Sequence, residues 1–485
     1  MEIQEVENIK IKTTTSIIFL TIRNLGIQAV SMLGFFILTI LLGTGEIGLF
    51  AIVAESVSIL GYFSDVGLAP TLIQQKHTPT LKQLRTSFFI QQVLVIIALI
   101  SVAIIYPKIS SSRSYGNKEM WITISLCFSF LAASLKTVPS ILLERELNFK
   151  LLSTVDIIEN LVFYIIAVAF AFLGFGGYSY AIATFARSIL GLVIIYYRAP
   201  WNIGIYFSFD TAKELFRYGI PFQLNSFIAM AKDRLSNLLV AGIIGRDSFG
   251  LLAWSQKGPR IPLNFMDAIM KVTFPTFARI QDDPELLKKS LSRSIFFIAI
   301  VVFPALAGIS VVAPDLISII PKYGKWAPAI LPMYLFAINA AIAAVTTPLT
   351  NAFNAVGKIT ITTRLMIMWT VLTWIFFPIL SKEYGYIGTA TANLIVGLSS
   401  FIVWLIARDI FGINVLKTIV HPLIATILLI ISALIINTTG VNPIFSILLK
   451  IFFGIVIYFG YQYRFTLKEI TWFYHQLKWL KVKKS

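Results

Sequence analysis

The sequence predicts an all-α polytopic membrane protein, with about fourteen transmembrane helices in two pseudo-two-fold-related six-helix lobes and a C-terminal helix pair. Of the 485 residues, 57% are hydrophobic and 13% are charged, which is roughly half the charged fraction of soluble domains. Long apolar runs recur with short loops between them, unlike the short alternating strands of a membrane β-barrel. In addition, short stretches of the first half of the chain recur in the second half.

Each apolar run is long enough for a helix that crosses the hydrocarbon core, which needs roughly 20 residues. Several runs contain charges, so their boundaries are taken to within a few residues. The runs cover residues 14–42, 47–74, 86–107, 119–143, 152–174, 177–198, 216–244, 248–276, 292–313, 328–350, 362–380, 386–407, 415–437 and 443–463.

The placement of positive charge orients these spans. The chain carries 40 Lys and Arg residues and a net charge of +17. Most of them fall on the side of the two termini, for example Arg145, Arg217, Lys289 and the lysines of the tail 465–485. Positive segments stay in the cytoplasm, so both termini are expected to be cytoplasmic. The basic balance therefore reflects topology and indicates no nucleic-acid partner. The tail suits either an interfacial helix on anionic lipid or a disordered segment.

Residues that carry catalysis or bind metals are sparse. Cys127 is the single cysteine and lies within a span, and the three histidines are far apart. No phosphate-binding loop of the form G-x-x-x-x-G-K-[ST] occurs. We expect no cofactor, no metal site and no enzymatic reaction.

Two pairs of matching stretches indicate an internal duplication. Residues 43–51 read GTGEIGLFA and residues 245–253 read GRDSFGLLA, 202 positions apart, and at this offset Asp65 falls on Asp267. A second pair, GYSYAIAT at 177–184 and GYIGTATA at 385–392, is offset by 208 positions. Gly and Ala are common in membrane helices, so chance similarity is the alternative. The matched positions within the spans favour duplication.

The duplication predicts like-oriented lobes, with a pseudo-two-fold axis along the membrane normal and a substrate site between them near the midplane. The expected divisions are a cytoplasmic N-terminus 1–13, an N-lobe 14–198, a cytoplasmic linker 199–215, a C-lobe 216–407, two further spans in 408–464 and a basic cytoplasmic tail 465–485.

Charges inside spans mark the candidate site, because charged side chains in membranes normally face a bundle interior or an aqueous cavity. The clearest pattern is in span 8, where helical geometry puts six polar residues on one face. An ion-pair seam between helices is the alternative reading. The six residues are Gln256, Lys257, Arg260, Asn264, Asp267 and Lys271.

Span 7 contains three adjacent charges in the stretch IAMAKDRLSNLLV at 228–240. Asp233 and Arg234 share its polar face, and Lys232 points away. We expect Arg234 to line a cavity, with Asp233 beside it as a counter-charge. Lys232 is expected to pack against a neighbouring helix or to extend its amine towards the membrane surface.

Basic residues outnumber acidic ones on the polar faces of both lobes, which predicts a cationic cavity and an anionic substrate. Arginine suits phosphate because its planar fork donates two parallel hydrogen bonds. The candidate substrate-binding residues are Arg23, Lys136, Arg187, Arg234, Lys257 and Arg260. The candidate gating or coupling residues are Glu55, Asp65, Asp233, Asp267 and Lys271.

Several stretches resemble those of the Wzx-type polysaccharide and O-antigen flippases, especially the colanic-acid and teichuronic-acid exporter branch of the multidrug/oligosaccharidyl-lipid/polysaccharide (MOP) superfamily. The stretches are GEIGLFAIV at 45–53, FSDVGLAPTLIQ at 63–74, LERELNF at 143–149, GFGGYSYA at 174–181, FPTFARIQDDPELLKK at 274–289 and NAVGK at 354–358.

The resemblance implies a V-shaped pair of six-helix lobes that alternates between inward- and outward-facing states in a prokaryotic plasma membrane. It implies that they flip an undecaprenyl-diphosphate-linked oligosaccharide for surface polysaccharide such as lipopolysaccharide. By position, the cavity cations of the family match Arg23, Arg234, Lys257 and Arg260. Coupling to H⁺ or Na⁺ is left open.

Three other functions remain as alternatives. A cation-coupled multidrug exporter of the same superfamily would favour an acidic cavity, and the lobe faces here are basic. A lipid II flippase would share the whole architecture. A membrane glycosyltransferase, acyltransferase or O-antigen polymerase would need large loops with catalytic groups, and the loops here are too short for that.

Overall fold

A computed structural model describes residues 26–75, 77–113 and 116–466. In this part of the chain every regular element is a helix, which confirms the all-α class. Arg23 and nearly all of the tail 465–485 lie outside the described residues. The chain divides into two compact units, unit 1 ending at Gly250 and unit 2 beginning at Leu251.

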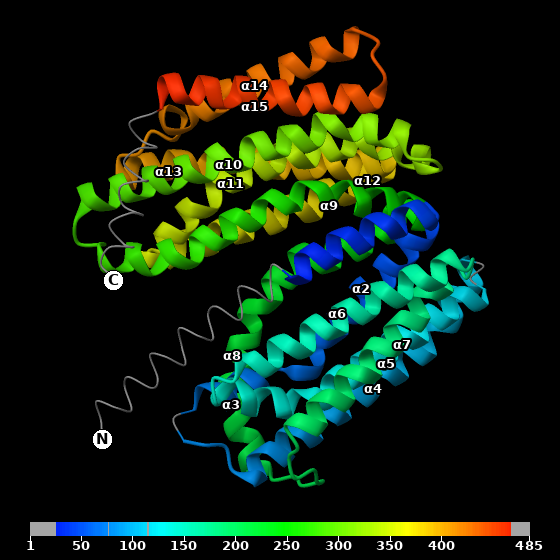
Figure 1. Ribbon diagram of the computed structural model, residues 1–485. Coiled ribbons are helices and arrows are strands. Elements are labelled where there is room, and N and C mark those ends of the chain that lie inside the picture. The colour runs from blue at the N-terminus through cyan, green and yellow to red at the C-terminus, as the bar shows by residue number, and fades with distance from the viewer. Residues whose placement is uncertain (1–25, 76, 114–115, 467–485) are drawn as a thin grey trace. The chain divides into compact units, whose positions relative to one another are not determined.

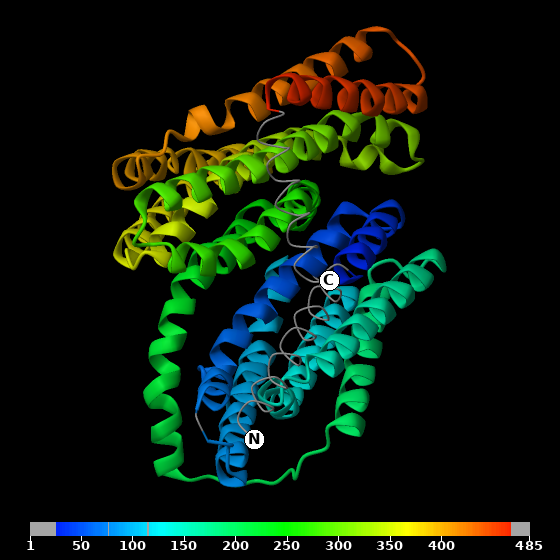
Figure 2. The ribbon, with the colours of Figure 1, turned by 60° about the vertical axis from the view of Figure 1, so that its left-hand side comes forward.

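Unit 1 is a bundle of long helices (Figure 1). Within it α7 packs against both α5 and α6, and α8 packs against α3 and α4. An extended segment, residues 199–208, connects α7 to α8 (Figure 2). The elements after the helix Gly26–Leu41 are α2 Thr44–Asp65, α3 Leu68–Gln74, α4 Leu81–Arg113, α5 Asn117–Arg145, α6 Phe149–Phe172, α7 Tyr178–Arg198, α8 Phe209–Met230, the π-helical turn η1 Ala231–Leu235 and the start of α9 Ser236–Arg279.

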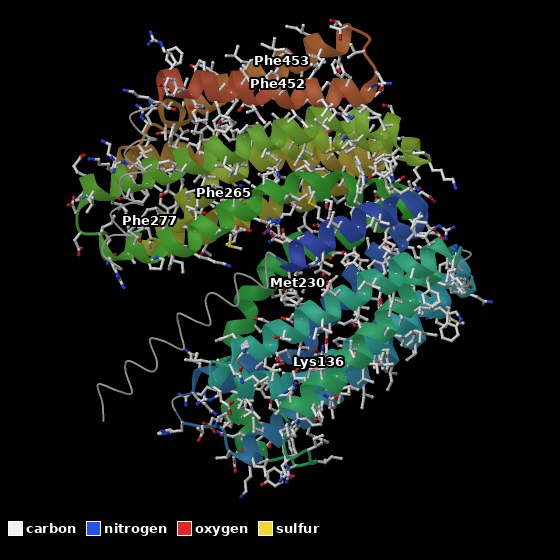
Figure 3. The ribbon with its side chains drawn as sticks, in the orientation of Figure 1. Lys136, Met230, Phe265, Phe277, Phe452 and Phe453 are labelled. Atoms are coloured by element: carbon white, nitrogen blue, oxygen red, sulfur yellow. The ribbon has the colours of Figure 1, made fainter. Side chains whose placement is uncertain are left out.

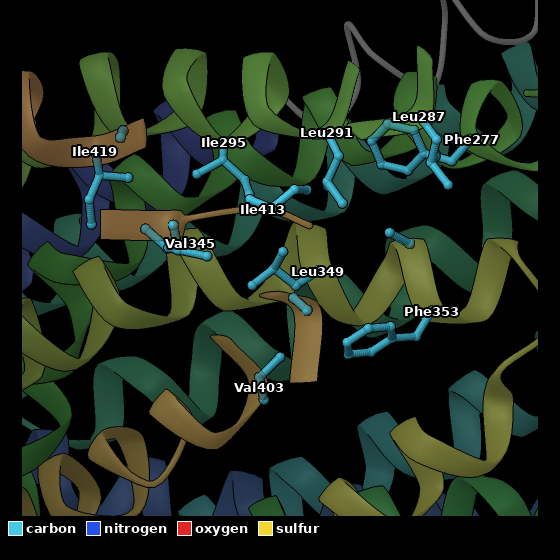
Figure 4. Close-up of a cluster of buried hydrophobic side chains, with 14 of the residues drawn as sticks. Phe277, Leu287, Leu291, Ile295, Val345, Leu349, Phe353, Val403, Ile413 and Ile419 are labelled. Atoms are coloured by element: carbon cyan, nitrogen blue, oxygen red, sulfur yellow. The ribbon is translucent and has the colours of Figure 1, made fainter. Parts of the chain in front are cut away.

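Unit 2 contains the rest of α9 and a second set of helices, in which α10 packs against α11 and α14, and α14 packs against α15. Its largest apolar cluster includes Phe277, Leu291, Leu349 and Phe353, all 1% exposed or less (Figure 4). The elements are α10 Pro284–Ile319, the 3₁₀ turn η2 Tyr323–Ala329, α11 Ile330–Ala355, α12 Ile359–Leu398, α13 Phe401–Phe411, α14 Val415–Thr438 and α15 Pro443–Phe465.

The number of crossings follows from two glycines. Eleven helices among the described residues are long and apolar enough to cross a membrane. Two of them contain a residue with non-helical backbone angles, Gly245 with φ 79° and Gly385 with φ 59°, a conformation that glycine adopts without steric cost. Splitting these two helices there and adding the shorter apolar helix Gly26–Leu41 gives the fourteen crossings that the sequence predicts.

Local sequence explains where several helices begin and end. Asn148, Asp283 and Asn414 each accept a hydrogen bond from a backbone N–H in the first turn of the following helix, which satisfies a donor that the helix leaves unpaired. α2 ends at Asp65 because Val66 and Gly67 both have positive φ, 44° and 76°. That break aims the short helix α3 away from the axis of α2.

Apolar side chains cover much of the outer surface. Phe452 and Phe453 of α15 are 61% and 42% exposed (Figure 3), and α4 likewise exposes Ile96, Ile97 and Ile100. Exposed apolar bands of this extent are typical of helices in contact with lipid, which satisfy their own backbone hydrogen bonds.

The two compact units do not follow the predicted lobes. Unit 1 includes α8, because α8 packs on α3 and α4, whereas the predicted divisions put residues 209–215 of α8 in the linker and the rest in the C-lobe 216–407. Repeat equivalence and local packing are different criteria. The predicted boundary at 199–215 stays a prediction.

Candidate functional site

The three adjacent charges of span 7 lie in a π-helical turn, η1, directly after the buried residue Met230 (Figure 3). Such turns insert an extra residue into a helix and are frequent at functional sites. In this turn Lys232 Nζ lies 2.7 Å from Asp233 Oδ1, and Arg234 donates from one guanidinium nitrogen to Glu55 Oε2 on α2, also at 2.7 Å.

These two pairs differ from the pattern that the sequence predicts. Asp233 neutralises Lys232, so it is not the counter-charge that contacts Arg234; that contact is made by Glu55. The prediction assumed α-helical spacing, whereas these three residues lie in a π-helical turn. A further hydrogen bond joins the same helices, from Gln223 Nε2 on α8 to the carbonyl of Tyr62 on α2 at 2.7 Å.

Two other predicted cavity cations lie inside the bundle of unit 1. Lys136 of α5 forms an ion pair with Glu159 of α6, and both side chains are less than one-fifth exposed. The Arg187 guanidinium of α7 lies 4.8 Å from the ring centre of Phe163. Gly191 on α7 leaves room for Glu159, because an added Cβ would lie 1.4 Å from the Glu159 carboxylate. Lys136 is therefore engaged within the lobe.

Asp65, one of the repeat-related carboxylates, ends α2. It accepts a hydrogen bond from the Ala69 N–H at 3.2 Å, across the break formed by Val66 and Gly67. Its carboxylate therefore acts as a cap for the start of α3, in a way that sequence spacing does not reveal.

The polar stripe of α9 is present in unit 2. On one side of the helix, Leu263, Met266 and Met270 pack into an apolar cluster with α10 and α11. On the other side Arg260, with a side chain 65% exposed, lies 3.4 Å from Asp267, which is 44% exposed. Lys257 and Lys271 are also exposed. The stripe therefore lies on the exposed side of the helix, where Asp267 pairs with Arg260; its role in transport stays a prediction.

A network of charges at one end of unit 1 was missed by the sequence reasoning. Glu46 accepts hydrogen bonds from the Gly43 N–H at 3.1 Å, the Gly177 N–H at 2.8 Å and Lys118 Nζ at 2.8 Å. Glu119 accepts from the Gly116 N–H and pairs with Arg246. The stretches GTGE and GNKE could have indicated it, since a Glu three residues after a helix N-cap commonly bonds back to it.

In the same place the two matching stretches of the repeat contact each other. A Cβ added to Gly48 would lie 1.8 Å from the carbonyl oxygen of Arg246, and one added to Gly250 would lie 2.0 Å from that of Thr44. At the repeat offset Thr44 matches Arg246 and Gly48 matches Gly250, so the contacts are exchanged, as a two-fold axis requires. Thr44 Oγ1 also donates to Asp247 at 3.1 Å.

A buried ion pair in unit 2 was also missed. Lys450 of α15, whose side chain is fully buried, lies 2.6 Å from Asp315 of α10, and Ser446 donates to the same carboxylate at 3.0 Å. This pair holds the C-terminal helices on α10. Among the described residues no three His, Cys, Asp or Glu side chains gather closely enough to hold a metal ion.

Solved structures show the fold. The lipid II flippase MurJ in its inward closed conformation aligns with a TM-score of 0.74 at 14% identity, over 94% of this chain and all of that chain. An inward-facing multidrug resistance MATE family transporter of the MOP superfamily aligns with a TM-score of 0.55 at 12% identity, over 82% of this chain and 99% of that chain. The fold is therefore the one found in this superfamily, as the sequence predicts.

Curated relatives agree with the resemblance found in the sequence. The lipopolysaccharide biosynthesis protein WzxC of Escherichia coli is 23% identical over 72% of this chain and 71% of its own length. The teichuronic acid biosynthesis protein TuaB of Bacillus subtilis is 24% identical over 61% of each chain. The family model described as "Polysaccharide biosynthesis protein" matches residues 37–331, and the chain belongs to that family.

Proposed function

We propose that this chain is a flippase that moves an undecaprenyl-diphosphate-linked oligosaccharide across the plasma membrane of a prokaryote for the synthesis of a surface polysaccharide. Its family supports a role in polysaccharide biosynthesis. The relatives named for the biosynthesis of lipopolysaccharide and teichuronic acid, and for succinoglycan biosynthesis transport, support a polymer precursor as the cargo. The termini are proposed to be cytoplasmic, as the positive charges indicate.

The observation that carries this proposal is the cationic face of α9. Arg260 and Lys257 are exposed on a helix whose other face is buried in apolar packing. Exposed charges on a membrane-crossing helix are costly unless they meet water or an anionic partner. A diphosphate supplies two anionic groups, and a guanidinium can bind one of them with two parallel hydrogen bonds.

Alternating access needs a contact that can open and close. The exchanged contacts of Gly48 and Gly250, together with the pairs around Glu46 and Glu119, supply such a contact at the start of spans 2 and 8. In the proposed topology this end faces away from the cytoplasm. The glycines there allow the two backbones to approach closely without a layer of apolar side chains between them. When the contact opens, the polar groups can form hydrogen bonds with water.

The rival functions differ in charge and in cargo. The cationic substrates of a multidrug exporter would be repelled by the exposed cations of α9. A lipid II flippase has the same fold and an anionic cargo, so the glycan separates the two. The proposal is supported if removal of this gene abolishes one surface polysaccharide and leaves peptidoglycan synthesis intact.

The first experiment measures surface polysaccharide in a cell that lacks the gene and carries variants at matched protein levels. Arg260→Gln and Lys257→Gln, alone and together, are expected to reduce export, because each removes a cation from the α9 face. Lys358→Gln is the matched control, since Lys358 is an exposed cation of unit 2 outside the stripe. Equal export by the double variant and the control would contradict the proposal.

The second experiment locks the contact at the start of spans 2 and 8. Thr44→Cys and Asp247→Cys, in a Cys127→Ser background, place two thiols where the side chains already hydrogen bond. Oxidation is expected to stop the movement of a lipid-linked oligosaccharide in vesicles, and a reductant to restore it. Full transport by the cross-linked protein would show that this contact does not open during transport.

A further inference from the structure

Glu55 and Arg234 are an anion and a cation from different helices, and their side chains are unequally exposed. The Glu55 side chain is 19% exposed and the Arg234 side chain is 46% exposed. Glu55 therefore approaches the guanidinium from the protein side, and nearly half of the arginine remains open on the other. Arg234 donates to Glu55 from one terminal guanidinium nitrogen, whereas a guanidinium carries five N–H donors.

The two neighbouring charges make their ion pair with each other. Lys232 and Asp233 pair with each other at 2.7 Å, so the three adjacent charges resolve into one local pair and one cation that reaches across to α2. The carboxylate of Glu55 is chemically similar to the anionic oxygen of a phosphate. In the absence of cargo it occupies part of the surface that a phosphate would use.

We infer that Glu55 is an internal competitor for the anionic group of the cargo, and that cargo binding at Arg234 requires displacement of the Glu55 carboxylate. The inference rests on the anionic cargo of the proposed function. A diphosphate displaces Glu55 because it offers more negative charge and a two-point contact with the guanidinium. A weak monoanion does not displace Glu55, so Glu55 raises the affinity for Arg234 that an anion needs in order to bind there.

The exchange also links binding to helix position. While Glu55 holds Arg234, the π turn η1 is tied to α2, and the Gln223–Tyr62 hydrogen bond ties α8 to α2 as well. When a phosphate takes Arg234, the ionic tie is lost and only the hydrogen bond remains. Cargo binding then loosens span 7 from span 2, and a ligand that binds the loosened state better shifts the equilibrium towards it.

The test uses the full chain in lipid nanodiscs and two probes, inorganic pyrophosphate and farnesyl diphosphate, with affinities measured by titration calorimetry. Glu55→Gln keeps the shape of the side chain and removes its charge. It is expected to tighten the binding of both probes by about two- to fivefold, the range that a partly exposed ion pair accounts for. Glu55→Ala is expected to act in the same direction.

Two controls separate competition from a general change in charge. Glu214→Gln makes the same charge change at an exposed carboxylate of α8 and leaves the Glu55–Arg234 pair in place, so it is expected to leave both affinities nearly unchanged. In an Arg234→Gln background, Glu55→Gln is expected to give no gain. Unchanged or weaker binding by both Glu55 variants, or an equal gain from Glu214→Gln, would overturn the inference.

These results are distinguishable from a failure of the proposed function. Pyrophosphate tests the exchange at Arg234 without a lipid or a glycan. If Glu55→Gln tightens pyrophosphate binding while cells lacking the gene keep their surface polysaccharides, the competitor role stands and the cargo is another diphosphate.

Discussion

The candidate cations of unit 1 and those on α9 in unit 2 are held in different ways. In unit 1 the two recorded ion pairs of Lys136 and Arg234 each join different helices. On α9 the Arg260–Asp267 pair joins residues of one helix at 3.4 Å, and the two side chains are 65% and 44% exposed. Pairs between helices hold the bundle together, whereas a loose pair within one helix leaves its cation accessible. The α9 cations are therefore the more available ones for an anionic cargo.

The most buried ion pair, Lys450–Asp315, tests how much stability a pair between helices contributes. Asp315→Asn is expected to lower the free energy of unfolding by about 3–5 kcal/mol, because it leaves the fully buried Lys450 ammonium without its partner. Thermal unfolding of the purified protein in detergent measures this. The double variant Asp315→Asn with Lys450→Met is expected to recover most of the loss. A double variant no more stable than the single one would show that the charge was not the cause.

A smaller loss is expected for the Lys136–Glu159 pair of unit 1, whose side chains are mostly buried. Glu159→Gln is expected to cost about 1–3 kcal/mol, since it leaves the mostly buried Lys136 without its carboxylate partner. Transport per folded molecule should change little. If Glu159→Gln and Lys136→Met stop transport in fully folded protein, then Lys136 contacts the cargo, as the sequence predicted, and the difference between the units disappears.

The opposite outcome is expected for Arg260. Arg260→Gln should change the free energy of unfolding by less than about 0.5 kcal/mol, as exposed substitutions usually do, while surface polysaccharide falls strongly. In span 7, Arg234→Ala should reduce surface polysaccharide more than Lys232→Ala does. Equal losses from the two span 7 variants would mean that the π turn, and not the Arg234 charge, is what matters.

The smallest effect on stability is expected at Asp267. Asp267→Asn should leave the binding of a diphosphate lipid nearly unchanged and alter the transport rate, because the carboxylate modulates Arg260 without contacting the cargo. Asp65→Asn is the repeat-related comparison, and it should also destabilise the turn between α2 and α3. Collapse of binding with an unchanged transport rate per bound cargo would place Asp267 in the cargo site.

Asp65 and Asp267 show how much an internal repeat reveals about side-chain contacts. Their equivalence was found from an offset in the chain, and both are carboxylates in membrane-crossing segments. The structure uses one as a cap at the end of α2 and the other as an ion-pair partner within α9. A duplication preserves the path of the backbone better than the partners of each side chain, so the shared gating role stays a prediction.

The sequence by itself determined the membrane class, the fourteen crossings, the family and the one-sided polarity of α9, because these depend on hydropathy and on helical periodicity within one segment. Only the tertiary structure decided which charges meet. Arg234 and Glu55 are 179 positions apart and Lys136 and Glu159 are 23 apart. Arg234 lies in a π turn, and Gly191 leaves room for the Glu159 carboxylate. No periodicity within one helix encodes such contacts, since these ion pairs require atoms of different helices to approach within a few ångströms.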